Sequence, residues 1–195
     1  MKKYEKIFQE NGGVARIHLL QEAGMTYYSL RALMEKGIVT KIKQGVYRLE
    51  HGESPVDEMV EVARMVPKGV YCLFSACTHY DLTTFVSGQH HLAIPKKSKV
   101  ALPSYPPIQL YYWAETSYHL GITTVESWGG MVNMYDVEKT VCDMVKFRSK
   151  VGIDTMKEVL HNYISRKDQK IHQLNNYARQ MNIEGVLSKY LEVLL

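Results

Sequence analysis

The sequence "MTYYSLRALMEKGIVTKIKQGVYRL", residues 25–49, combines one helical pattern with two strand patterns. Thr26 is a residue type that caps helix N-termini, and Gly37 is the residue type that most often ends a helix. Between them the apolar residues recur at helical spacing and form one stripe: Leu30, Leu33 and Met34. The pattern predicts a short amphipathic helix that begins after Thr26.

The second half of this stretch predicts a β-hairpin. The runs Ile38–Lys43 and Val46–Leu49 alternate apolar and polar residues, and Gln44-Gly45 joins them. Glycine at such a junction permits the backbone conformation that a tight hairpin turn requires.

Upstream, the apolar spacing predicts helices over Lys3–Glu10 and Ala15–Glu22, although the second has no Ser or Thr at its expected cap. Three short helices followed by a hairpin are typical of a winged helix-turn-helix. We therefore expect residues 1–53 to form such a DNA-binding domain.

The charge of the chain is concentrated at the same end. The net charge is +4, and residues 1–49 hold nine Lys or Arg against four Glu, whereas the remainder holds 15 basic against 16 acidic residues. A basic end of this kind is expected where a small module meets a polyanion, but it also fits an ordinary solvated surface.

Residues near the start of a recognition helix reach base edges first, so Tyr28, Ser29 and Arg31 are the candidates for reading bases. Lysines of the wing are the candidates for phosphate contacts. We expect Tyr27 to pack against the core. The full candidate set of this domain is Thr26, Tyr28, Ser29, Arg31, Lys36, Lys41, Lys43 and Gln44.

Residues 54–195 predict a separate α+β domain with a roughly four-stranded sheet and several helices. Ser54-Pro55 indicates a helix start, and "VYCLF" indicates a strand that leads into a short helix capped by Ser75. The expected strands are His90–Ile94, Ile108–Tyr112, Thr123–Trp128 and Met131–Tyr135. The expected later helices begin after Asp136 and cover Ile153–Ser165, Gln169–Gln180 and Ile183–Leu194.

A second basic cluster, Lys96, Lys97 and Lys99, lies on a proline-bounded loop of this domain. It fits either a site for phosphate or an acidic partner, or a solubilising loop.

Sequence motifs of catalysis and of metal binding are absent. There is no HExxH, GxSxG, P-loop or GxGxxG, and the three cysteines lack zinc spacing, so we expect buried thiols, no metal and no cofactor. Ser75 and His79 would share one helix face, but cap and core roles explain them more simply. His90 and His91 point to opposite faces of a strand, which argues against joint binding of one ion. We expect no enzyme.

The first twelve residues lack the apolar segment of a secretory signal, and no apolar run is long enough to span a bilayer. Together with the unpaired cysteines, this predicts a cytoplasmic protein without a membrane partner.

Four stretches carry a resemblance to a known family: "GIVTKIKQGVYRL", "VPKGVYCLFSACTHYDLTT", "AIPKKSKVALPSYPPIQLYYW" and "VNMYDVEKTVCDMVKFRSKVGID". In this order they resemble AbiEi-type proteins, the antitoxins and transcriptional regulators of the AbiE abortive-infection toxin–antitoxin system of bacteria. The resemblance covers nearly the whole chain, from about Tyr4 to Leu195, and Asp136-Val137 departs from it where the family often has Ser-Pro.

The resemblance implies a protein that binds double-stranded DNA at inverted repeats and represses its own operon. It also implies a functional partner, a nucleotidyltransferase-like toxin, that is counteracted by the second domain without a stable complex. We expect a monomer in solution and two copies on DNA. The resemblance further implies that basic residues of the second domain, Lys96, Lys97 and Lys99, and more weakly Lys146, Arg148 and Lys150, help to hold DNA.

A regulator whose second domain senses a small molecule near His79 and His90 is the alternative from another class. A ligand that binds only the folded state would stabilise such a sensor, which distinguishes the two.

Overall fold

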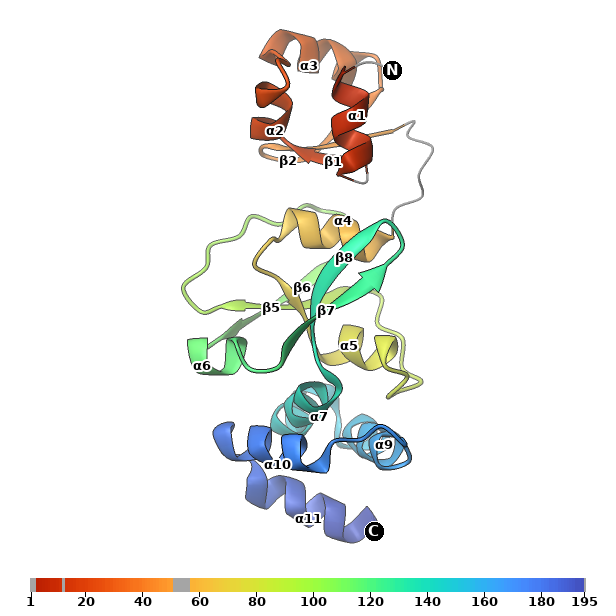
Figure 1. Ribbon diagram of the computed structural model, residues 1–195, viewed down its shortest axis with the longest axis vertical. Helices are drawn as coiled ribbons and strands as arrows, with labels where there is room; N and C mark the ends of the chain where they lie inside the picture. Colours follow the sequence, from red (N-terminus) through yellow and green to blue (C-terminus); the bar gives the residue numbers. More distant parts are fainter. Residues whose placement is uncertain (1–2, 12, 51–56, 195) are drawn as a thin grey trace. The chain divides into compact units, whose positions relative to one another are not determined.

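The computed structural model of the chain describes residues 3–11, 13–50 and 57–194 and has a mixed α+β fold (Figure 1). Within these ranges it contains eleven helices and two β-sheets, one of three strands and one of five. The chain divides into two compact units. The first comprises 1–68, 99–108 and 125–132, and the second comprises 69–98, 109–124 and 133–195. The expected boundary between residues 53 and 54 lies outside the described residues and stays a prediction.

The first unit begins with three helices and a three-stranded antiparallel sheet of order β1-β3-β2. The predictions of the first helix, the third helix and the two hairpin strands are confirmed. The elements are α1 (Lys3–Glu10), β1 (Val14–Arg16), α2 (Ile17–Glu22), α3 (Tyr27–Glu35), β2 (Val39–Lys43) and β3 (Val46–Leu49).

The predicted helix over Ala15–Glu22 is wrong at its start, because residues 14–16 form strand β1. This strand pairs with β3, with Val14 opposite Arg48. Helix α2 then begins at Ile17 without a side-chain hydrogen bond at its cap. Two features of the sequence indicate that the helix does not begin at Ala15. No Ser or Thr stands at the expected cap, and Val14 is β-branched, which favours a strand.

Helix α4 (Glu58–Met65) follows, and the carboxylate of Asp57 caps it by accepting a hydrogen bond from the Met59 amide at 3.0 Å. The start that we predicted at Ser54-Pro55 lies outside the described residues. The Asp57 amide donates to the Trp128 carbonyl at 2.9 Å, which ties this helix to the 125–132 segment of the same unit.

The second sheet has five strands in the order β6-β5-β4-β8-β7. The expectation of four strands is too low, because the two-residue strand β4 lies at the centre of the sheet, antiparallel to β5 and parallel to β8. The strand indicated at the start of "VYCLF" is confirmed as β4, although the expected count of four leaves it out. The strands are β4 (Val70–Tyr71), β5 (His90–Pro95), β6 (Ile108–Trp113), β7 (Ile122–Ser127) and β8 (Gly130–Tyr135).

Helix α7 (Val137–Lys146) is the best packed helix of the second unit, with eight of its residues buried. Asp136 caps it as predicted, by accepting a hydrogen bond from the Lys139 amide at 2.8 Å. The helices predicted after it are confirmed within two residues at each end, whereas α6 and α8 were not predicted. The other helices of this unit are α5 (Leu73–His79), α6 (Glu115–Tyr118), α8 (Arg148–Val151), α9 (Ile153–Ile164), α10 (Ile171–Gln180) and α11 (Glu184–Leu194).

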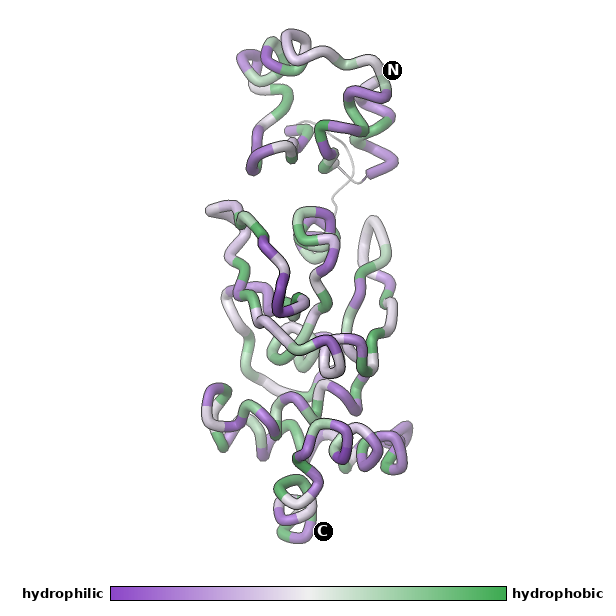
Figure 2. Tube along the Cα trace, turned by 90° about the vertical axis from the view of Figure 1, so that its left-hand side faces the viewer, coloured by the Kyte–Doolittle hydropathy of each residue, from purple (hydrophilic) through white to green (hydrophobic). Residues whose placement is uncertain are grey.

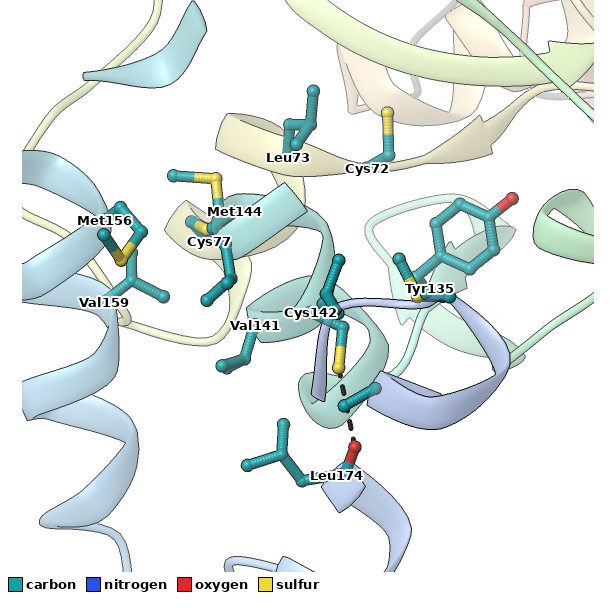
Figure 3. Packing of buried hydrophobic residues seen from close by; sticks show 14 of the residues in the cluster. Cys72, Leu73, Cys77, Tyr135, Val141, Cys142, Met144, Met156, Val159 and Leu174 are labelled. Carbon is teal, nitrogen blue, oxygen red and sulfur yellow. Dashed lines mark hydrogen bonds between the residues drawn. The ribbon is translucent and has the colours of Figure 1, made fainter. Parts of the chain in front are cut away.

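The core of the second unit forms where α7 meets its neighbours (Figure 3). All three cysteines are buried, as predicted, and Cys142 Sγ donates a weak hydrogen bond to the Leu174 carbonyl at 3.6 Å. The prediction that Ser75 caps α5 is wrong. Position 72 precedes the helix, and Ser75 Oγ instead accepts a hydrogen bond from the His91 amide at 2.9 Å.

No helix among the described residues is long and apolar enough to cross a membrane, and hydrophilic segments recur along the whole trace (Figure 2).

A fully buried ion pair lies on α7, within the core of the second unit. Lys139 Nζ contacts both carboxylate oxygens of Asp143 at 2.7 Å and stands 4.2 Å from the ring centres of Trp113 and Tyr135. Burial raises the pKa of Asp143 to about 6. Each charge is costly in this setting unless the other is present.

We predict that Lys139→Ala lowers the free energy of unfolding by about 3–5 kcal/mol, because it leaves the Asp143 carboxylate buried without its partner. The double variant Lys139→Met, Asp143→Leu should recover most of this loss. Urea denaturation measures both. The exposed pair of Lys6 and Glu10, with its N–O distance of 3.6 Å, provides the control, since Lys6→Ala should change stability by less than about 0.5 kcal/mol. Equal losses in Lys139→Ala and in the control would contradict this account of the core.

Candidate nucleic-acid interface

Helix α3 begins at a reciprocal cap. The Ser29 amide donates to Thr26 Oγ1 at 3.2 Å, and the Thr26 amide donates to Ser29 Oγ at 2.9 Å. Two of the backbone donors at the helix start are thereby satisfied by side chains. At the other end Gly37 adopts φ +66°, which closes the helix where the sequence predicted.

The inner face of α3 anchors the helix in the core of the first unit. Leu30 is buried, and Leu33 and Met34 pack against the same cluster, as the stripe predicted. The buried members of this cluster are Phe8, Ala15, Leu20, Leu30, Val39 and Tyr47. A helix fixed by its cap and by this stripe presents a defined set of side chains to solvent.

The outer face of α3 carries two exposed tyrosines and an ion pair. Tyr28 is 83% exposed, and Arg31 Nε donates to Glu35 Oε1 at 3.0 Å on the same helix. The expectation that Tyr27 packs in the core is wrong, because Tyr27 is 66% exposed and meets the Tyr28 ring edge-on. The side chain of a first helical residue projects past the N-terminus of the helix, where no preceding turn covers it.

The hairpin separates the predicted wing residues into two groups. Lys41 and Gln44 are exposed at its turn and contact each other, Lys41 Nζ donating to Gln44 Oε1 at 2.9 Å. Lys43, by contrast, is half-buried, and its Nζ donates to the carbonyls of Met65 at 2.8 Å and of Ala101 at 2.9 Å. Burial, and then the nearby Arg16, lower the pKa of Lys43.

Lys43 belongs to a set of cations by which the three-stranded sheet holds α4. Arg16 Nη2 donates to the Arg64 carbonyl at 3.2 Å, and Arg48 pairs with Glu61 at 2.5 Å. Carbonyls in the last turn of a helix lack intrahelical donors and carry the negative end of the helix dipole, so they attract cations. We call Arg16, Lys43 and Arg48 the α4-contacting cations; part of the basic charge counted in the sequence therefore has partners within the unit.

The other basic candidates of the interface are exposed to solvent. Lys36 is exposed at the C-terminal end of α3, and Lys96, Lys97 and Lys99 are exposed between β5 and β6. Thr26 and Ser29 are exposed and bond each other through the cap.

Lys96 and Phe147, which are far apart in sequence, both contact Trp113 in the second unit. The Lys96 amide donates to the Trp113 carbonyl at 2.8 Å, and the Trp113 ring stacks on Phe147 with 5.9 Å between the ring centres. Phe147 lies between Lys146 and Arg148, and Lys150 Nζ is 5.9 Å from the centre of its ring. Lys146 and Lys150 are exposed, whereas Arg148 donates from Nη1 to the Val145 carbonyl at 3.1 Å.

His79, His90 and His91 differ in their surroundings. His91 is buried and contacts Ser87 Oγ at 2.7 Å and the Tyr111 hydroxyl at 2.8 Å, and burial lowers its pKa to about 4. His90 meets the ring of Tyr71 instead, as expected for neighbours on a strand. His79 is exposed.

Within the described residues, Ser75 and His79 form no hydrogen bond with each other, and the Ser75 hydroxyl instead accepts one from the His91 amide. Across residues 3–11, 13–50 and 57–194, no three His, Cys, Asp or Glu side chains are grouped so that they could hold a metal ion.

A surface hollow of about 330 Å³ lies beside α3. Its lining is mostly apolar and comes from α1, from the turn before α3 and from α3 itself: Tyr4, Ala23, Gly24, Met25, Ser29, Ala32 and Leu33. The sensor alternative predicted a pocket near His79 and His90, and neither residue lines this hollow.

Comparisons with known proteins show the fold of the chain. The structure is similar to the crystal structure of the RV2827C protein from Mycobacterium tuberculosis, with a TM-score of 0.51 and 11% sequence identity. The match covers 98% of this chain and 79% of that one. No protein-family model and no curated protein sequence matches. At this identity, the likeness extends to the α+β architecture alone.

We predict that His91 makes the stability of the protein depend on pH. The folded pKa of about 4 lies below the usual value of about 6.5, so the unfolded chain binds the proton more tightly. The stabilising contribution is therefore complete above pH 6.5 and is lost as the pH falls toward 4, by on the order of 1–3 kcal/mol.

Urea midpoints between pH 7.5 and pH 4.5 measure this effect. As the pH falls, His91→Gln should lose less stability than the wild type does, because the opposite contribution of Asp143, whose pKa is raised, is present in both proteins. The exposed His79 provides the control, since His79→Gln should keep the wild-type profile. Parallel profiles for wild type and His91→Gln would show that His91 is not the group responsible.

Proposed function

We propose that residues 3–50 form a winged helix-turn-helix that binds double-stranded DNA, with α3 as the recognition helix and the β2–β3 hairpin as the wing. The order of helices and strands supports this proposal, as does the antiparallel pairing of the hairpin. The resemblance to AbiEi-type proteins is an independent argument for the same module.

The observation that carries the proposal is the outer face of α3. This face holds exposed aromatic, hydroxyl and guanidinium groups, while the opposite face is packed in the core. A helix of this kind fits the major groove, where Tyr28, Ser29 and Arg31 would meet base edges. Thr26 at the helix N-terminus, Lys36, Lys41 and Gln44 would contact phosphates.

Lys43 has a different place in this proposal. Because its ammonium group already binds two carbonyls, a phosphate contact would require it to leave them. Lys41 is thus the principal phosphate contact of the wing. The basic residues Lys96, Lys97 and Lys99, with Lys146, Arg148 and Lys150, are the further DNA contacts that the resemblance implies.

The proposed biological role is that of a repressor and antitoxin. Two copies, monomeric in solution, would bind inverted repeats upstream of their own operon. The second domain would counteract a nucleotidyltransferase-like toxin in the cytoplasm without forming a stable complex. The resemblance supports this role, and the packed core around α7 gives the second domain a stable scaffold.

We predict that binding to DNA from upstream of the gene depends strongly on salt. Neutralisation of about five phosphates gives a slope of log affinity against log salt of roughly −4 to −5. Lys41→Ala should reduce the magnitude of this slope by about one, whereas Lys6→Ala, which removes an exposed charge from α1, should leave it unchanged. Fluorescence anisotropy over a range of salt concentrations measures these slopes. A slope near zero for the wild type would contradict DNA binding through phosphates.

We also predict that repression and antitoxin activity separate in the full-length protein. Arg31→Ala should derepress a reporter gene placed behind the upstream DNA, because base contacts specify the site. The same variant should still rescue the growth of cells that express the neighbouring toxin gene. Loss of rescue by this well-folded variant would contradict the assignment of antitoxin activity to the second domain.

A further inference from the structure

Arg31 is held at one edge of its guanidinium group. Its Nε donates to Glu35 Oε1 one helical turn further along α3, and both side chains are about two-thirds exposed. Within the described part of the chain, its terminal nitrogens Nη1 and Nη2 hold no hydrogen bond. The ion pair therefore leaves two parallel N–H donors at the tip of the side chain.

Two such donors match guanine, which presents the acceptors O6 and N7 side by side in the major groove. An arginine that is already oriented loses less side-chain freedom on binding than a free one does. The i,i+4 spacing places Glu35 on the same outer face as Arg31, where it can hold the guanidinium group while the tip meets a base.

Glu35 is otherwise unfavourable at this place. A carboxylate on a surface that approaches phosphates is repelled by them, so it should weaken contact with any DNA. A carboxylate that orients an arginine lowers the affinity for all DNA but increases the difference in affinity between the specific sequence and other sequences. Specificity is a difference of affinities, and it can be gained at the expense of affinity.

We propose that Glu35 is a positioning residue that orients Arg31 toward guanine, so that each half-site of the recognised DNA contains a guanine read by Arg31. This inference rests on the proposed function and deepens it by naming a base of the target.

The test is selection of duplexes from a random-sequence DNA pool by the full-length protein, followed by affinity measurements on the selected duplex and on a scrambled duplex. The variants are Glu35→Ala, Glu35→Gln and Arg31→Lys. Glu10→Ala is the matched control, because it removes one carboxylate from the exposed i,i+4 pair of Lys6 and Glu10 on α1.

The wild type should select a motif with a fixed guanine. Glu35→Ala should lower the ratio of specific to scrambled affinity roughly tenfold while binding the scrambled duplex as well as or better than the wild type does. Glu35→Gln, whose amide oxygen still accepts from Arg31 Nε, should lose less. Arg31→Lys keeps the charge but lacks the fork, so its preference for the guanine should be weaker than that of the wild type, and adding Glu35→Ala to it should change the ratio no further.

The experiment can reject the positioning role of Glu35 without rejecting DNA binding. If the wild type selects a motif but Glu35→Ala keeps the same guanine and the same affinity ratio as Glu10→Ala, the positioning role is overturned and DNA binding stands. If the wild type selects no motif and shows no salt-dependent binding, the proposed function itself fails. Replacing the fixed guanine by 7-deazaguanine, which lacks the N7 acceptor, should weaken binding by the wild type more than binding by Arg31→Lys.

Discussion

The reciprocal cap between Thr26 and Ser29 is the constraint on which the candidate interface depends. It fixes the residue at which α3 begins, and the burial of Leu30 fixes the rotation of the helix about its axis. Once both are set, Tyr28 and Arg31 must face outward. A shift of the helix register by one residue would turn each side chain by about 100° around the axis and would disperse this face.

The first unit shows that positive charge in a sequence is not the same as positive charge available to a ligand. Arg16, Lys43 and Arg48, the α4-contacting cations, bind carbonyls or a carboxylate of their own unit. The exposed basic groups that remain on α3 and on the hairpin are Arg31, Lys36 and Lys41. In the second unit, Lys139 is an extreme case, since its buried charge is paired with Asp143 and covered by two aromatic rings and is not available to a ligand.

The sequence predicted most elements because their patterns were long enough or had clear caps, as at Thr26, Gly37 and Asp136. It failed where a pattern was too short to have a period. The helix predicted over Ala15–Glu22 overlaps strand β1, and the expected four-stranded sheet leaves out β4, although "VYCLF" indicates a strand there. For the candidate site, the spacing of the apolar residues Leu30, Leu33 and Met34 predicted which face of α3 points outward. The engagement of Lys43 and the exposure of Tyr27 depend on contacts between distant segments and on the direction of a side chain at a helix start, which a single sequence does not show.

In the proposed function, α3 and the turn of the hairpin form the surface that meets DNA. Chemical-shift mapping of the ¹⁵N-labelled full-length protein, titrated with a duplex from upstream of its gene, tests this most directly. We expect the largest amide shifts on Tyr27–Lys36 and Lys41–Gly45, while the amide signals around the buried Lys139 and Asp143 should not move. Shifts that leave α3 unaffected, or that fall only on residues 69–194, would contradict it.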